Sequence, residues 1–146
     1  MSGLREALDA RLDAGETGTV EVSTNDASAT VDVVAVGPLG ARVRRIEVRG
    51  ERGGVEQVAA SLPHDLRALP EPIEAVEVDA SLGGAILRTP PEAMEQGEFF
   101  EVEVRGDSVA IDRYRRQPGG RESIDYDLTR KQLGRLVDAL EHPRRD

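Results

Sequence analysis

The sequence predicts an α+β fold in which helices pack on one mostly antiparallel, twisted sheet of about eight strands. Apolar residues recur at helical spacing near both ends of the chain and once in its middle. Between these segments, β-branched and polar residues alternate, and short turn sequences such as GPLG, SLGG and PGG separate the alternating stretches. We therefore expect an N-terminal, a central and a C-terminal helix around the sheet.

The first part of the chain predicts a helix followed by a three-stranded meander. The helix is expected over residues 2–14 because of an apolar stripe formed by Leu4, Ala7, Leu8 and Leu12. The segments TVEVS, ATVDVVAV and ARVRRIEVR then alternate as strands do. The alternation changes phase once on each side of the GPLG turn, within residues 31–36 and 43–48. Such a paired change predicts a β-bulge or a strand covered on both faces.

A second apolar stripe predicts the central helix, and it consists of Val55, Val58, Ala59 and Leu62. Pro63 should end this helix or start a new turn, because proline removes a backbone donor. The following segment, HDLRALPEP, is typical of a compact connector, and we expect Leu66 and Leu69 to anchor it in the core.

Five further strands are expected after Ile73, in the segments IEAVEVDA, GAILRT, EFFEVEVR, SVAIDRY and ESIDYDL. Alternation in the first of them predicts that Val76 and Val78 face the core while Glu77 and Asp79 face water.

The last helix has the clearest local signals in the chain. Thr129 is the expected N-cap, with Gln132 completing a capping box. Its buried stripe should be Leu133, Leu136, Val137 and Leu140. Residues 143–146 are expected to form a frayed tail.

We expect residues 1–146 to form a single domain, since the length suits one core. A subdivision would fall at the glycine-rich residues 50–54. Both halves begin with a helix and continue with antiparallel strands, so an internal duplication is the alternative.

The composition bounds the chemistry and the partners. A net charge of −9 disfavours nonspecific binding to nucleic acid. The absence of cysteine excludes disulfides, thiolate metal sites and cysteine nucleophiles. No signal peptide or apolar run of membrane-spanning length is evident, so we expect a cytoplasmic protein without membrane contact. The arginine-rich, lysine-poor usage is typical of GC-rich, bacterial-like coding.

Candidate catalytic groups are few. His64 and His142 are the only histidines, which excludes a multi-histidine metal centre. No serine lies in a nucleophile elbow, and no glycine-rich loop has the spacing of a nucleotide-binding motif. We therefore expect no catalytic residue, no metal and no cofactor.

The segment DRYRRQPGGRESIDY, residues 112–126, is the main candidate for a binding surface. We expect it to form a β-hairpin around Pro118, Gly119 and Gly120. The candidate partner-binding residues are Phe100, Tyr114, Arg115, Arg116 and Arg121, because aromatic and arginine side chains are enriched at protein interfaces. The favoured alternative is that the arginines neutralise neighbouring acids such as Glu122, Asp125 and Asp127.

Phe99 and Phe100 are consecutive and must point to opposite faces of a strand. One of them then needs a cover outside the core, which a helix or another subunit could supply.

By elimination, the sequence predicts a noncatalytic protein-binding or adaptor module, with a protein partner or self-association, for example as a homodimer. The alternatives are an anion or nucleic-acid binder that uses the arginine hairpin, and an enzyme that depends on the carboxylates of the sheet.

Overall fold

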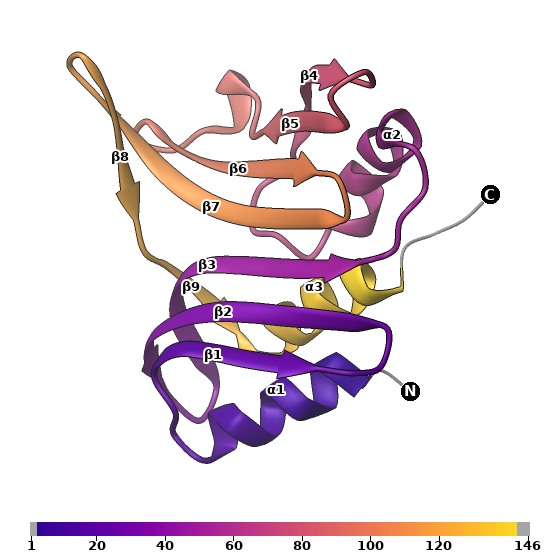
Figure 1. The fold of residues 1–146 in the computed structure, drawn as a ribbon. Coiled ribbons are helices and arrows are strands. Elements are labelled where there is room, and N and C mark those ends of the chain that lie inside the picture. Colours follow the sequence, from indigo (N-terminus) through magenta and orange to yellow (C-terminus); the bar gives the residue numbers. More distant parts are fainter. Residues whose placement is uncertain (1–2, 143–146) are drawn as a thin grey trace.

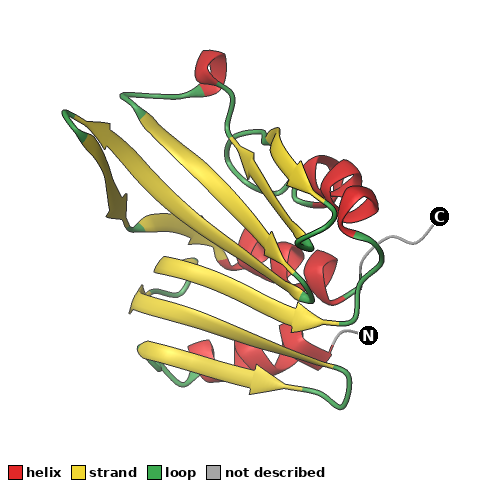
Figure 2. Cartoon of the chain, turned by 45° about the horizontal axis from the view of Figure 1, so that its top comes forward, coloured by secondary structure: helices red, strands yellow, loops and turns green. Residues whose placement is uncertain are grey.

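A computed structural model describes residues 3–142, and within this range it contains three α-helices and a nine-stranded antiparallel sheet (Figures 1 and 2). The predicted fold class is thus confirmed. In chain order the elements are α1 (Gly3–Asp13), β1 (Gly18–Ser23), β2 (Ala27–Val36), β3 (Gly40–Gly50), α2 (Val55–Asp65), β4 (Glu74–Asp79), β5 (Gly84–Arg88), the 3₁₀ turn η1 (Pro91–Ala93), β6 (Glu98–Arg105), β7 (Ser108–Gln117), β8 (Gly120–Ile124), β9 (Tyr126–Thr129) and α3 (Arg130–Glu141).

The strands follow the order β1-β2-β3-β7-β6-β5-β4, and two short strands lie off this path. On the side away from β2, strand β3 pairs with β7 over Arg45–Arg49 and with β9 over Gly40–Val43. The far part of β7 instead pairs with β8. The sheet therefore splits at this point, and Figure 1 shows β8 running from the projecting hairpin back to β9. The expectation of a single strand over ESIDYDL is wrong, because the chain pairs with β7 before Asp125 and with β3 after it.

All three helices cover the same face of the sheet, here called the helix face, and the other side is the open face (Figure 2). Helix α1 packs on β1 and β2, α3 on β3 and β9, and α2 on β4 and β5. One continuous apolar cluster joins the helices to the sheet. Its largest fully buried members are mainly leucine and isoleucine, as expected for an aliphatic core.

The two parts of the chain repeat one plan. Helix α1 precedes the meander β1–β3, and helix α2 precedes the meander that begins with β4. Each helix lies beside the strand that follows it, and these strands, β1 and β4, end the strand order on opposite sides. The order of elements thus agrees with the prediction that both halves begin with a helix and continue with antiparallel strands.

The phase changes around the GPLG turn produce a register shift between β2 and β3. Val33 pairs with Val43 and Ala35 with Arg42, so Val34 and Arg44 have no directly opposite residue. This irregularity is the one that the sequence predicts, and it leaves the side chain of Val34 47% exposed.

Pro63 does not end the central helix, so that expectation is wrong. Helix α2 continues to Asp65, with Pro63 inside it. Proline removes one donor, but the Leu66 N–H still bonds to the carbonyl oxygen of Leu62 at 2.8 Å and completes the last turn. The burial of Leu66 and Leu69 confirms that they anchor the connector.

The expectation that the core covers Val76 and Val78 is also wrong, although Val78 does lie on the helix face, opposite the buried Ala85. The side chains of Val76 and Val78 are 55% and 42% exposed. Strand β4 pairs only with β5, and its register is irregular between Ala75 and Glu77. A strand at the rim of a sheet has a neighbour on one side only, so its apolar residues are covered far less than those of β6 or β7.

The C-terminal helix has the predicted structure. The Gln132 N–H donates to Thr129 Oγ1 at 3.0 Å, and the Thr129 N–H donates to Gln132 Oε1 at 2.9 Å, which forms the capping box. Its apolar stripe is at most 2% exposed and consists of Leu133, Leu136, Val137 and Leu140. The frayed tail expected over residues 143–146 and the helix start at Ser2 lie outside the described residues.

None of the helices within residues 3–142 combines the length and the apolar character that crossing a membrane requires.

Candidate functional site

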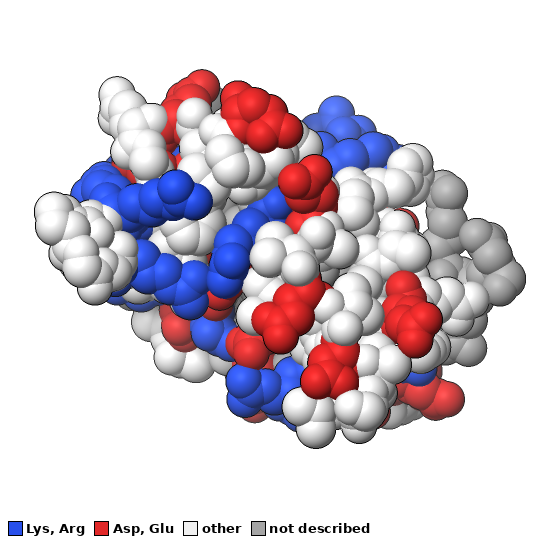
Figure 3. Space-filling model, turned by 90° about the horizontal axis from the view of Figure 1, so that it is seen from above, with Lys and Arg blue, Asp and Glu red and all other residues white. Residues whose placement is uncertain are grey.

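The predicted arginine hairpin is formed by β7 and β8, with Tyr114 opposite Ser123, Arg115 opposite Glu122 and Arg116 opposite Arg121. Alternation places Tyr114, Arg116 and Arg121 on the open face, whereas Arg115 lies on the helix face. Figure 3 shows basic side chains concentrated on the side that carries this hairpin, with acidic side chains among them. The candidate arginines therefore act on two different faces.

The structure places Phe100 in the core rather than on a surface. Its side chain is 1% exposed, and its ring meets Tyr126 edge-on with centroids 5.3 Å apart. The guanidinium of Arg113 lies 4.4 Å from the ring centroid. Phe100 is thus a core residue that Tyr126 and Arg113 cover, and it contributes only a small exposed area to the cavity described below.

Phe99 lies on the open face, as the alternation requires, and is 4% exposed. Its cover comes from the same chain, because Tyr114 lies 5.9 Å away between ring centroids and the Arg116 guanidinium lies 5.9 Å from its ring. Neither a helix nor a second subunit is needed to shield it.

On the helix face, the arginines of β7 form ion pairs. Arg113 donates to both carboxylate oxygens of Glu71 at 3.0 and 3.2 Å and to Glu98 at 3.3 Å. Arg115 donates to Glu98 at 3.0 Å and to Glu122 at 3.4 Å. The hydrogen bond from Arg115 is the main cause that holds the pKa of Glu98 below its ordinary value. Both guanidinium groups are thus already occupied by acids of the same chain.

A cavity of about 500 Å³ lies where the sheet splits, and these ion pairs line it. Acidic side chains outnumber basic ones in its lining, which contains Arg42, Arg113, Arg115, Glu71, Glu95, Glu98, Asp125 and Asp127. Each of the three arginines is paired with a carboxylate. Among the described residues that line it, the cavity consequently offers an anion no arginine that is free of a carboxylate partner.

The open face carries a second network, centred on Glu101 of β6. This carboxylate is 8% exposed and accepts hydrogen bonds from Arg121 at 2.7 and 3.1 Å and from Arg88 at 2.6 Å. Arg121 also lies 3.9 Å from the ring centroid of Tyr114. Burial alone would raise the pKa of Glu101, but the bonds from Arg121 and Arg88 outweigh it and lower the pKa.

Asp112 of β7 lies directly opposite Glu101, and its pKa is shifted in the other direction. It is 8% exposed and pairs with Arg45 at 3.1 Å. Burial raises the pKa of Asp112 above its ordinary value, and Arg45 offsets this only in part. Two neighbouring carboxylates with opposite pKa shifts are a feature of acid and base pairs, but here arginines engage both of them.

The sequence favours the alternative that the hairpin arginines neutralise Glu122, Asp125 and Asp127, and the structure agrees with it in part. Arg115 does pair with Glu122, whereas Asp125 and Asp127 pair with Arg44 at 2.8 Å and Arg42 at 2.9 Å. Among the arginines of β7 and β8, the described contacts leave only Arg116 without a carboxylate partner.

This difference predicts unequal effects on stability when the two arginines that pair across the hairpin are substituted. Arg121→Gln should lower the free energy of unfolding by about 1 kcal/mol, because it removes charged hydrogen bonds to a buried acid. Arg116→Gln should leave the midpoint of thermal unfolding almost unchanged. Thermal unfolding of both variants checks this, and equal losses would contradict the network.

The candidate catalytic groups do not converge. His64 contacts Arg67, with the Nη1 to Nε2 distance at 3.0 Å. The hydroxyl of Ser61 donates to the Val58 carbonyl oxygen and that of Ser108 to Glu47, so neither contacts His64. The structure therefore provides no support for a serine nucleophile with His64 as its base.

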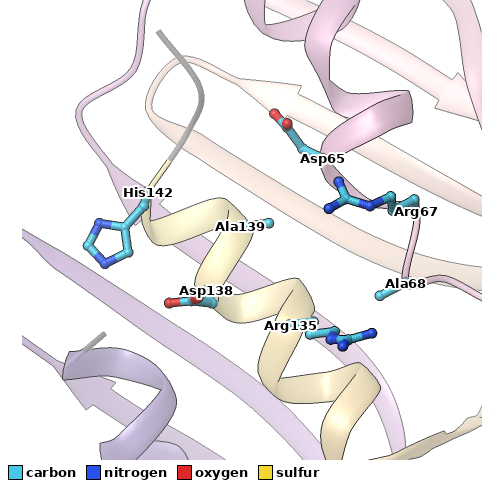
Figure 4. A pocket seen from close by; sticks show the side chains of 7 residues that line it. All are labelled: Asp65, Arg67, Ala68, Arg135, Asp138, Ala139 and His142. Carbon is cyan, nitrogen blue, oxygen red and sulfur yellow. The ribbon is translucent and has the colours of Figure 1, made fainter. Parts of the chain in front are cut away.

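A second cavity, of about 650 Å³, lies between the end of α2 and the end of α3. In Figure 4, Arg67 and Arg135 lie on one side of α3, whereas Asp138 and His142 project from its other side. Ligand atoms of Asp138, Glu141 and His142 lie within 4.8 Å of one another. However, Glu141 accepts the Leu4 N–H at 3.1 Å, so it links the first turn of α1 to α3.

The β4–β5 hairpin exposes apolar side chains that the sequence analysis assigned to the core or left unassigned. Val76, Val78 and Leu82 are 55%, 42% and 82% exposed. Together with the exposed acids Glu74 and Glu77, they form what we call the β4 surface. The signal in the sequence was the three acids of EAVEVD, because charged side chains are common on edge strands.

The turn of this hairpin is well defined. The Asp79 carboxylate accepts hydrogen bonds from the Ser81 hydroxyl at 2.7 Å and from the backbone N–H groups of Ser81 and Leu82 at 3.1 and 3.2 Å. The bond from the Ser81 hydroxyl is the main cause that lowers the pKa of Asp79. Leu82 is thus held at a fixed place at the tip.

Comparison of the chain with protein-family models, with curated proteins and with solved structures finds no match.

Proposed function

We propose that this protein is a noncatalytic protein-binding module that holds a segment of a partner protein on the β4 surface. The exposure of Val76, Val78 and Leu82 at the rim of the sheet is the observation that carries this proposal. Single exposed apolar residues are ordinary on a protein surface, but a group of them on one hairpin is typical of an interaction site. Binding would remove this apolar surface from water.

Binding of anions or nucleic acid through the arginine hairpin is less well supported. Arg113, Arg115 and Arg121 would each have to release a carboxylate before they could hold a phosphate. Arg116 is the hairpin arginine that the described contacts leave free of acids. The net charge of −9 acts against such a ligand as well.

A carboxylate-dependent enzyme is also less well supported. Such an enzyme needs one acid that can exchange a proton with a substrate. The carboxylate of Glu101 forms ion pairs with Arg88 and Arg121, and that of Asp112 forms one with Arg45. The arrangement of these acids favours a role in holding β5, β6, β7 and β8 together.

Two exposed leucines offer a matched test of the proposal. Leu82 in the β4 surface is 82% exposed, and Leu39 in the turn between β2 and β3 is 84% exposed. We expect Leu82→Asn to reduce the capture of a specific partner from native lysate, while Leu39→Asn captures it as the unchanged protein does. The partner identified by mass spectrometry is then purified, and its Kd for the three proteins is measured.

Equal affinity of the three proteins for that partner would contradict the assignment of binding to the β4 surface. Capture of no specific protein under gentle salt would contradict the binding function itself. Because both leucines are exposed, neither change should alter thermal unfolding, which serves as the control for folding.

A further inference from the structure

We infer that the partner segment binds as an extended strand added to the free edge of β4, and that this strand alternates basic and apolar residues. This inference rests on the proposed function and adds the binding mode and the chemistry of the partner. It combines a free hydrogen-bonding edge, the exposed acidic side chains of β4 and the alternation of side chains along this strand.

The edge of β4 is available for pairing. Among residues 3–142, β4 pairs only with β5, so the backbone groups on its other side meet no strand. Exposed edges of this kind bind extended peptides through main-chain hydrogen bonds. The irregular register lies between Ala75 and Glu77, which leaves Glu77, Val78 and Asp79 in regular pairing with β5.

The opposite edge of the sheet is less accessible. The Arg11 side chain from α1 donates to the backbone carbonyl oxygen of Glu21 in β1 at 2.9 Å. This guanidinium occupies an acceptor that an added strand would need. Within the described residues no such contact covers β4, although α2 stands next to it as α1 stands next to β1.

The charge of β4 favours a basic partner. The strand EAVEVD contains three acids and no basic residue. Glu77 is exposed and forms no ion pair among the described contacts. Glu74 is also exposed and lies directly opposite Arg88 of β5, but Arg88 donates its hydrogen bond to Glu101. Opposite charges directly across two strands stabilise their pairing, so arginine or lysine in the added strand would meet these glutamates.

The same charges disfavour a second copy of this chain as the occupant. Antiparallel pairing of two β4 strands centred on Glu77 would place Glu77 opposite itself. A pairing centred between Val76 and Glu77 would place Glu74 opposite Asp79. Both registers place like charges directly opposite each other, which destabilises strand pairing. A register that avoids this still brings the three acids of each strand side by side, so the charges favour a partner of different sequence.

The two faces of β4 require different side chains. Val78 lies opposite Ala85, which is 4% exposed and belongs to the core, so Val78 is on the helix face. Glu77 lies opposite Ile86 and is on the open face. An added strand would thus place apolar residues beside Val78 and basic residues beside Glu77, which is the alternation of an ordinary half-buried strand.

Synthetic peptides test this inference. The first is a capped decapeptide of alternating Arg and Val, and the second has Glu in place of each Arg. A third and a fourth peptide keep the first sequence but carry methyl groups on backbone nitrogens. The third has them on every Arg and the fourth on every Val. Fluorescence anisotropy measures each Kd, and amide hydrogen exchange of residues 74–79 locates the binding.

We expect the Arg-Val peptide to bind, to slow exchange at residues 74–79, and to lose affinity as salt is added. The Glu-Val peptide should bind at least about tenfold more weakly, since each ion pair would become a repulsion. One N-methylated peptide should lose binding, because its methyl groups face β4, and the other should retain it.

Charge reversal in the protein gives a second readout. Glu77→Arg should weaken the Arg-Val peptide by about tenfold and strengthen the Glu-Val peptide. Glu21→Arg, on the other edge strand, is the matched control and should change neither affinity beyond the general effect of net charge.

Equal binding of the two peptides, equal loss with both N-methyl patterns, or protection outside residues 74–79 would each overturn the inference. Protection of these residues by the protein itself at high concentration would show a second copy to be the occupant, which also overturns it. If the Arg-Val peptide fails while Leu82→Asn still weakens the captured partner, the binding function stands and only the mode is wrong. If Leu82→Asn and Leu39→Asn behave alike, the proposed function fails whatever the peptides do.

Discussion

Truncating the chain before Thr129 should abolish cooperative unfolding. Helix α3 contributes four apolar side chains that are at most 2% exposed, Leu133, Leu136, Val137 and Leu140. It also packs against α1, β3 and β9, so its loss exposes the middle of the helix face. Thermal and urea unfolding followed by circular dichroism would show a gradual change instead of a sigmoidal transition.

A point substitution separates packing from the general effect of truncation. Leu136→Ala should lower the free energy of unfolding by about 3 kcal/mol, as is typical for a fully buried leucine. Lys131→Ala, at an exposed position of the same helix, should have little effect. A truncated chain with the melting transition of the full chain would refute the packing of α3 on the sheet.

Glu101→Gln should lower the free energy of unfolding by about 2 kcal/mol at neutral pH, whereas Asp112→Asn should leave it unchanged or raise it. Glu101 is buried between Arg88 and Arg121, and its loss of charge leaves both guanidinium groups without their partner. The arginines are themselves 36% and 40% exposed in their side chains, which keeps the loss below that of a fully buried pair.

The pKa shifts give the pH dependence of this pair. The pKa of Glu101 is lowered, so its contribution is complete above the ordinary value of 4.5 and is lost as pH falls through the folded-state pKa. The pKa of Asp112 is raised by burial, so its ionisation opposes folding. The protonated form of Asp112 therefore favours the folded state. This contribution to stability is present below the ordinary pKa of 3.8 and is lost as pH rises through the folded-state pKa.

Urea unfolding of the two variants between pH 3 and pH 7 checks both signs. The difference between the unchanged protein and Glu101→Gln should shrink as the solution is made acidic. Any gain from Asp112→Asn should be largest at neutral pH and vanish at the acid end. A destabilisation by Asp112→Asn equal to that of Glu101→Gln would show that Arg45 holds Asp112 as tightly as Arg88 and Arg121 hold Glu101.

The sequence by itself determined the features that depend on near neighbours along the chain. The three helices follow from apolar spacing, and the capping box of α3 uses two residues three positions apart. The irregular pairing of β2 with β3 follows from the phase change of the valines, because alternation along a strand directly sets the face of each side chain. Opposite faces for Phe99 and Phe100 follow in the same way.

Only the tertiary structure decided which strands are interior and which partners the charges have. Alternation marks two faces of a strand but not whether anything covers them, so Phe100 is buried on the interior strand β6 while Val76 and Val78 are exposed on the edge strand β4. The ion pairs join distant segments, such as Arg113 with Glu71 and Arg42 with Asp127. Strand order brings these groups together, and local sequence patterns contain no information about contacts over such separations. The free, acidic edge of β4 is a product of that order.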